Sequence, residues 1–240
     1  MATKWPACMP EWTCANISDG SGRLNSILTS KWSKVFVFLL ALTPAAMLAW
    51  QLFTGHLGPD PVATLQHGTG DWTLRFLIFT LFITPLRKML KLPQLIRFRR
   101  MLGLFAFFYV CLHFLTYLGP DQSFDFAGML KDVGKRPFIT VGFAGFVLLI
   151  PLAITSTAGM IRRMGGKRWR ILHRLVYVTA ILGVIHYYWL VKSDHRKPLT
   201  YGAFVAALLL WRAGAWIVDR RKRKVAGSVP VAEPPTAETA

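Results

Sequence analysis

Six long runs of apolar residues constrain the fold of this chain more than any other feature of its sequence. A helix needs about 20 apolar residues to cross a hydrocarbon layer roughly 30 Å thick, and each run has close to that length. The runs also explain how a chain that is 53% hydrophobic carries a net charge of +18, because most basic residues lie between them. The sequence therefore predicts an all-α integral membrane protein with six transmembrane helices, at Val35–Phe53, Trp72–Leu90, Met101–Leu118, Phe138–Ala158, Ile171–Val191 and Tyr201–Val218.

The positions of Lys and Arg predict how these helices are oriented. If the N-terminus lies inside, 20 of the 29 Lys and Arg fall on inner segments, whereas the three outer loops hold none, three and three. Basic residues collect on the cytoplasmic side of membrane proteins, so both termini are expected in the cytoplasm. The expected parts are a cytoplasmic leader at 1–33, a six-helix membrane domain at 34–223 and a disordered cytoplasmic tail at 224–240.

The spread of positive charge over loops argues against a nucleic-acid surface, and membrane lipid is the expected partner of the basic residues. Motifs that hold soluble redox cofactors are also absent. No GxGxxG or phosphate-loop pattern occurs, and loops of at most about 20 residues leave no room for a nucleotide-binding domain. Cys8, Cys14 and Cys111 match no common zinc or iron–sulfur spacing. Any electrons must come from a lipid-soluble donor or another protein.

Three of the six histidines, His113, His173 and His186, lie inside predicted membrane helices. An ionisable residue is costly in a membrane and usually faces the interior of a helix bundle. Three such residues on two helices favour a shared ligand, and neutral imidazole is a common axial ligand of haem iron. The pattern predicts a bundle that binds b-type haem and transfers electrons, without substrate chemistry of its own.

Depth along the helices predicts which histidines act together. At a rise of ~1.5 Å per residue, His113 lies ~20 Å and His186 ~24 Å from the inner ends of their helices. We therefore expect these two to bind one haem iron near the outer leaflet. His173 lies only ~5 Å from the inner end, where it is a candidate ligand of a second, inner haem. The residue 14 positions before His113 is Arg99, so the number of haems, one or two, stays open.

The other histidines carry weaker signals. His67 lies in the outer stretch Asp60–Gly70. There a capping or interfacial role competes with a role as a ligand or as a docking residue for a partner. His56 and His195 lie in outer loops and are expected to be solvated.

Short motifs along residues 34–223 resemble those of one known family, the MsrQ (YedZ) haem-binding membrane subunits of a periplasmic methionine sulfoxide reductase system. The wider likeness is to the ferric-reductase-like transmembrane domain, whose members have two histidines on the third helix where this chain has one. The motifs are DPV…QHGTG at Asp60–Gly70, FITPLRK at Phe82–Lys88, IRFRRMLGL at Ile96–Leu104, CLHFLTY at Cys111–Tyr117, RPFITVG at Arg136–Gly142, TST at Thr155–Thr157, WRILHRLVY at Trp169–Tyr177 and IHYYW at Ile185–Trp189.

The resemblance implies an electron-transfer subunit in the bacterial inner membrane. Such proteins take electrons from the quinone pool, or from a flavin reductase, and pass them through haem b. The implied recipient is MsrP, a periplasmic molybdenum-containing subunit that reduces methionine sulfoxide in damaged proteins. The resemblance also implies FMN, without residues to assign to it. Two alternatives remain: a ferric or oxygen reductase, and a non-redox transporter in which the histidines form a proton relay.

Overall fold

The computed structural model describes residues 28–227, and in this part of the chain every element is helical. The prediction of an all-α protein is confirmed for these residues. Most of the predicted leader and tail lies outside them. The elements are α2 Lys31–Phe53, α3 Pro61–Met89, the 3-10 turn η1 Pro93–Leu95, α4 Ile96–Thr116, the π-helical turn η2 Tyr117–Asp121, α5 Phe126–Lys135, α6 Pro137–Ile154, α7 Ala158–Met164, α8 Gly166–Leu172, α9 Leu175–Leu190 and α10 Arg196–Gly227.

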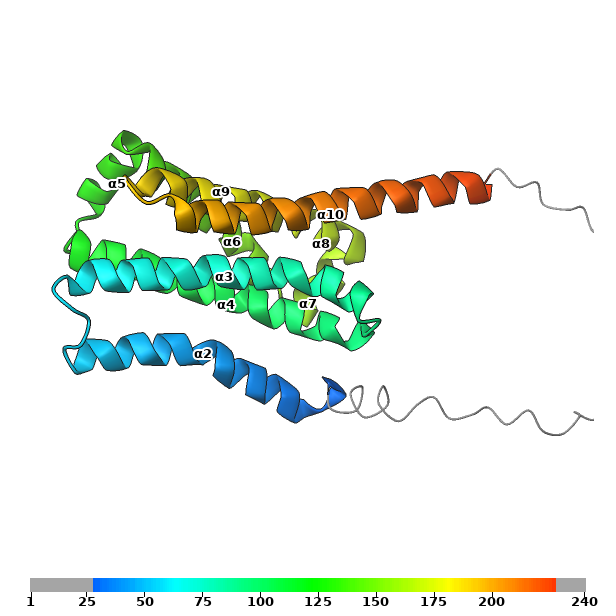
Figure 1. The fold of residues 1–240 in the computed structure, drawn as a ribbon, viewed down its shortest axis with the longest axis horizontal. Coiled ribbons are helices and arrows are strands. Elements are labelled where there is room, and N and C mark those ends of the chain that lie inside the picture. The colour runs from blue at the N-terminus through cyan, green and yellow to red at the C-terminus, as the bar shows by residue number, and fades with distance from the viewer. Residues whose placement is uncertain (1–27, 228–240) are drawn as a thin grey trace, which may run out of the picture.

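The long helices run side by side, as Figure 1 shows, and the short ones cap the two ends of the bundle. Helices α3 and α4 form the most extensive pair, and α6 packs along α9. Helix α10 lies against α9 and α3, whereas α2 touches α3 and α4 only lightly. Helix α5 lies at one end of the bundle, and α7 and α8 lie at the other (Figure 1). The histidine-bearing helices α4 and α9 are thus held by α3 and α6.

Five helical segments of the described chain are long and apolar enough to cross a membrane. They coincide with five of the six predicted spans. Large apolar side chains such as Phe36, Phe53 and Leu210 are exposed on the outer faces of these helices, as expected where lipid is the solvent. The five segments are Lys31–Phe53, Pro93–Asp121, Pro137–Ile154, Gly166–Leu190 and Arg196–Arg221.

Helix α3, which contains the remaining predicted span at Trp72–Leu90, is not among these five. It begins earlier than predicted because Asp60 accepts a hydrogen bond from the Ala63 N–H at 3.0 Å, which caps the first turn. Asp71 and Arg75 lower its apolar character, but they contact each other at 3.8 Å. Many of its side chains are buried, because α3 packs against α4, α9 and α10.

The predicted span Ile171–Val191 is interrupted near its N-terminal end. Helix α8 ends at Leu172 and α9 begins at Leu175, so that His173 and Arg174 form a junction. The Arg174 N–H bonds the carbonyl of Ile171, three residues back, at 3.1 Å, which tightens the chain at this point. His173 therefore lies at a break between helices and not within a continuous one.

Pro85 interrupts the backbone hydrogen bonds of α3, and a charged residue of α10 compensates. Proline has no N–H to donate to the carbonyl of Leu81, four residues earlier. Arg212 donates to this carbonyl from Nη2 at 3.1 Å and to the Thr84 hydroxyl at 2.8 Å. Its Nη1 also donates to the hydroxyl of Tyr177. The guanidinium group thereby joins α3, α9 and α10.

Pro44 has a similar effect in α2, where a tyrosine of α4 repairs the helix. The buried Tyr109 hydroxyl accepts a hydrogen bond from the Ala45 N–H at 3.0 Å and donates one to the carbonyl of Ala41 at 2.9 Å. One hydroxyl thus bridges two backbone groups of α2 that lie on either side of Pro44. This contact attaches α2, which has few others, to the rest of the bundle.

Candidate functional site

The bundle contains a cavity of about 340 Å³ near the end that carries α5. Side chains from α3, α4, α5, α6 and α9 line it. Part of its wall is apolar, formed by residues such as Leu74, Leu77, Phe146 and Leu149. The rim near α5, which we define as His67, Tyr117, Asp121 and Arg136, is polar. The cavity is therefore suited to a flat, mostly apolar molecule with polar groups at one edge.

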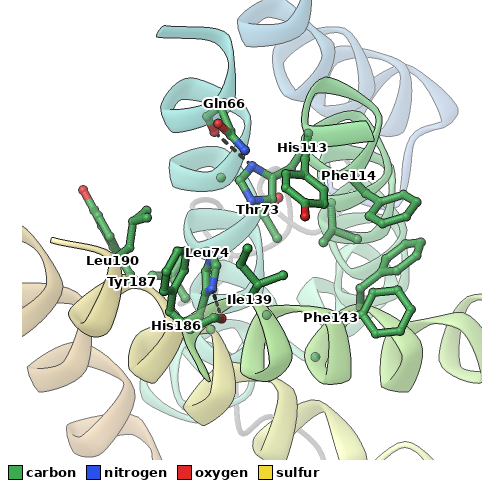
Figure 2. Close-up of a pocket in the computed structure, with 18 of the residues that line it drawn as sticks. Gln66, Thr73, Leu74, His113, Phe114, Ile139, Phe143, His186, Tyr187 and Leu190 are labelled. Carbon is green, nitrogen blue, oxygen red and sulfur yellow. Dashed lines mark hydrogen bonds between the residues drawn. The ribbon is translucent and has the colours of Figure 1, made fainter. Parts of the chain in front are cut away.

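His113 of α4 and His186 of α9 both project into this cavity, as Figure 2 shows. Their ring centroids are 6.1 Å apart, and the ring planes lie at 78° to each other. Two imidazoles bound to opposite sides of one metal through bonds of about 2 Å have centroids roughly 6 Å apart. The structure brings together the two histidines that helix depth pairs, at a separation that fits one metal between them.

A backbone carbonyl fixes the orientation of each ring. Nδ1 of His113 lies 2.9 Å from the carbonyl oxygen of Gln66, and Nδ1 of His186 lies 2.7 Å from that of Phe138. A carbonyl can only accept, so Nδ1 carries the hydrogen in both rings and Nε2 carries the lone pair. Neither Nε2 atom has a hydrogen-bond partner among the described residues. This arrangement is typical of histidines that bind a metal through Nε2.

Two glycines make room for the rings, and each follows the bonded carbonyl by four residues. A Cβ atom at Gly70 would lie 3.2 Å from Nδ1 of His113, and one at Gly142 would lie 2.6 Å from Nδ1 of His186. The second distance is shorter than real Cβ contacts. Sequence reasoning missed these glycines and the carbonyls of Gln66 and Phe138. Glycine within an apolar membrane helix was the only available signal.

Bare metal ions have no evident site in the described part of the chain. Within residues 28–227, no three His, Cys, Asp or Glu side chains are grouped so that they could hold an ion. His113 and His186 supply only two ligands. Two ligands suit a metal that brings further ligands of its own, as a tetrapyrrole does.

His173 does not belong to this cavity. It lies at the junction of α8 and α9, where Nε2 is 3.1 Å from the Thr155 hydroxyl and the ring stacks on Trp169 with centroids 4.0 Å apart. Arg99, the residue singled out on the third helix, is close enough to affect it electrostatically. Within the described residues, no second histidine faces His173.

The remaining histidines differ in their surroundings. His67 is exposed and lies on the rim of the cavity, and His56 is exposed. His195 is half-buried, with its ring centroid 4.7 Å from that of Tyr188. The expectation that His195 is solvated is therefore wrong, because the turn before α10 folds it onto this aromatic ring.

Comparison with known proteins decides the family. The profile of the family described as ferric reductase like transmembrane component matches residues 69–184, which include His113 and His173. A protein-methionine-sulfoxide reductase heme-binding subunit MsrQ of Herminiimonas arsenicoxydans is 56% identical over 198 residues, or 81% of this chain and 91% of that protein. The chain belongs to the MsrQ family. MsrQ proteins of Caulobacter vibrioides and Polaromonas naphthalenivorans are 54% and 48% identical, over 73% and 79% of this chain and 84% and 88% of their own.

Membership of the MsrQ family fits the structure in two ways. The family profile is that of a transmembrane component, and five helices of the chain can span a membrane, so the chain is a multi-pass membrane protein. The relatives are named as subunits of a methionine sulfoxide reductase, which places them in a redox system. The resemblance inferred from the short motifs is confirmed.

Proposed function

We propose that this chain binds b-type haem between His113 and His186 and transfers electrons across the membrane. The observation that carries the proposal is the opposed pair of rings, each with Nδ1 bonded to a carbonyl and Nε2 unbonded in the cavity. The relatives named as heme-binding subunits support it. The residues fit the group, because two neutral imidazoles and an apolar wall are what a six-coordinate haem requires.

The residues around the cavity have distinct tasks in this proposal. When bound, haem supplies one-electron chemistry at its iron, and the protein does no bond chemistry on methionine sulfoxide. His113 and His186 would hold the iron through Nε2. The carbonyls of Gln66 and Phe138 keep both imidazoles in the ligating tautomer. Apolar side chains such as Leu77 exclude water, which is one of the factors that set a haem potential.

The proposed topology has six spans in the bacterial inner membrane, with both termini in the cytoplasm. Helix α3 is the sixth span, since it lies along α4 and is longer than α4. The distribution of Lys and Arg supports this orientation. It places the His113–His186 cavity and α5 on the periplasmic side and His173 near the cytoplasm.

Donor and acceptor follow from that orientation. Electrons enter from the quinone pool or from a flavin reductase at the cytoplasmic side, where His173 is the candidate ligand of a second haem. They leave to the periplasmic molybdenum-containing subunit MsrP, which repairs oxidised proteins. The FMN implied by the family resemblance is a further redox group in this proposal, and we assign no residues to it.

Absorption spectra of the purified protein test the proposal. We expect a sharp α-band of six-coordinate b haem after reduction with dithionite, and a pyridine haemochrome assay gives the number of haems. His113→Ala and His186→Ala should each lose the haem of the outer site, whereas His56→Ala, at an exposed position away from the cavity, should keep it.

Electron transfer is tested by adding the periplasmic subunit and methionine sulfoxide to the reduced protein. The α-band should then decay. It should persist when the periplasmic subunit and methionine sulfoxide are both left out. A wild-type protein that stays colourless after hemin is added, or two histidine variants with full haem content, would overturn the proposed site.

A further inference from the structure

Tyr117 and Arg136 are polar residues at the rim of the cavity, and both have donor groups that make no hydrogen bond of ordinary geometry with the described residues. Tyr117 lies one helical turn beyond His113, and Arg136 lies two residues before Phe138, whose carbonyl holds His186. Both side chains line the cavity. Tyr117 and Arg136 therefore both lie on the α5 side of the two histidines. A flat ligand between the two histidines would present one edge to both residues.

Tyr117 has a hydroxyl group that is buried and makes no hydrogen bond of ordinary geometry with the described residues. A buried hydroxyl that makes no hydrogen bond is costly, so its presence usually indicates a missing ligand or water. The charged groups that act on it are Asp132, Asp121 and Arg136. The Asp132 carboxylate lies close enough to interact with the hydroxyl, although no hydrogen bond of ordinary length and angle joins them. The O–H can therefore turn from Asp132 towards an acceptor in the cavity.

Among the described residues that line the cavity, Arg136 is the only Lys or Arg. Its Nε contacts Oδ1 of Asp132 at 3.6 Å. Its two terminal nitrogens make no hydrogen bond or ion pair with the described residues, and the side chain is 56% exposed. A guanidinium group can bind a second carboxylate through these nitrogens while keeping the first. Asp132 also accepts a hydrogen bond from Gln122, at 3.4 Å, so Arg136 is not its sole partner.

We propose that Tyr117 and Arg136 form a carboxylate-binding subsite that holds the propionates of the haem at the rim near α5. The proposal rests on the proposed function. Haem bound between His113 and His186 must place its two negative carboxylates somewhere, and the opposite part of the wall, around Leu77 and Leu149, is apolar. The Tyr117 hydroxyl and the Arg136 terminal nitrogens are donors of the kind that carboxylates need.

The neighbouring acids sharpen this assignment. Asp121 and Asp132 repel a further anion at the rim, so a propionate can bind there only where a cation faces it directly. Arg136 is that cation. Lys131 of α5 is exposed and does not line the cavity, so it provides a matched control for loss of one positive charge.

Hemin and its dimethyl ester, in which both propionates are uncharged, distinguish this subsite from a structural role. Each is titrated into the apoprotein in detergent, and the ratio of the two affinities is measured. We expect the wild-type chain to prefer hemin by about tenfold or more, since one or two charge-assisted hydrogen bonds are lost with the ester. Tyr117→Phe and Arg136→Gln should each lower this ratio, and the double variant should bring it close to one.

Controls separate the possible results. Lys131→Gln should keep the wild-type ratio, and Arg136→Lys should keep part of it. Unchanged affinity for the ester shows that a variant retains its fold. If the wild-type chain binds hemin and its ester equally well, the proposed subsite is wrong, and no variant is needed to show it. This is the result expected if the rim binds a lipid phosphate instead. An unchanged ratio in the double variant would overturn the subsite as well. A wild-type chain that takes up neither compound refutes the proposed function itself.

Discussion

Replacing Gly142 with alanine adds one methyl group at the point where α6 meets His186. The new Cβ atom would lie 2.6 Å from Nδ1 and 2.8 Å from Cε1 of the ring. Ordinary contacts of this kind begin at 3.4 Å, so the ring must shift by roughly 1 Å. The 2.7 Å bond to the carbonyl of Phe138 holds the ring in place, and such a shift would break it.

The size of the effect follows from these two contacts. Overpacking of a rigid site costs about 1–3 kcal/mol, and the lost hydrogen bond adds about 0.5–1.5 kcal/mol. A total of roughly 1.5–4.5 kcal/mol corresponds to haem binding that is about 10- to 1,600-fold weaker. Titration of the apoprotein with hemin, followed by absorption, measures this directly. The reduced spectrum shows whether haem that still binds keeps both axial ligands.

Two other glycines set the scale for this prediction. A Cβ at Gly70 would lie 3.2 Å from the ring of His113, so Gly70→Ala should weaken binding less than Gly142→Ala. A Cβ at Gly103 would meet only Thr80, at 3.7 Å, and Gly103→Ala should bind haem as the wild type does. Equal affinities for Gly142→Ala and Gly103→Ala would refute the reasoning, because His186 would then not depend on its contact with α6.

Two further predictions concern the repaired prolines. Tyr109→Phe removes the hydroxyl that bridges Ala45 and Ala41, so the free energy of unfolding should fall by about 1–3 kcal/mol while the haem content stays the same. Thermal unfolding in detergent measures this, and an unchanged melting temperature would contradict a stabilising role for the bridge. Arg212→Met removes the donor to the carbonyl freed by Pro85 and should destabilise the protein similarly, whereas Arg220→Met, at an exposed position, should not; equal stability of both variants would show that Arg212 does not support α3.

The transmembrane regions could be predicted because an apolar run of sufficient length has few other uses. The same patterns could not locate the ends of α3. Its first turn is fixed by Asp60 and Pro61, and its polar residues Asp71 and Arg75 are paired inside the bundle. Apolar runs indicate which segments face lipid, whereas α3 faces mainly other helices. The break at His173 was also missed, since it depends on a hydrogen bond between backbone groups.

The pairing of His113 with His186 could be predicted from depth alone, because both helices run in the same direction from a common inner boundary. Depth does not tell on which face of its helix a residue lies. The 6.1 Å separation of the two ring centroids could therefore be known only from the structure. Whether the two side chains bind iron is a matter for the spectra. The residue 14 positions before His113 is Arg99, and this sequence feature is the reason why the number of haems stays a prediction.

Both histidines are held by the same local arrangement of backbone groups, although α3 and α6 provide it with different sequences. In α3 and in α6, one backbone carbonyl accepts from Nδ1, and the glycine four residues later leaves space for the ring. The side chains of Gln66 and Phe138 take no part in these bonds, so only the glycines are constrained in type. Carbonyl groups orient both rings without adding the negative charge that acidic partners would bring. The two rings are therefore oriented by uncharged groups, and no further charge has to be buried for this purpose.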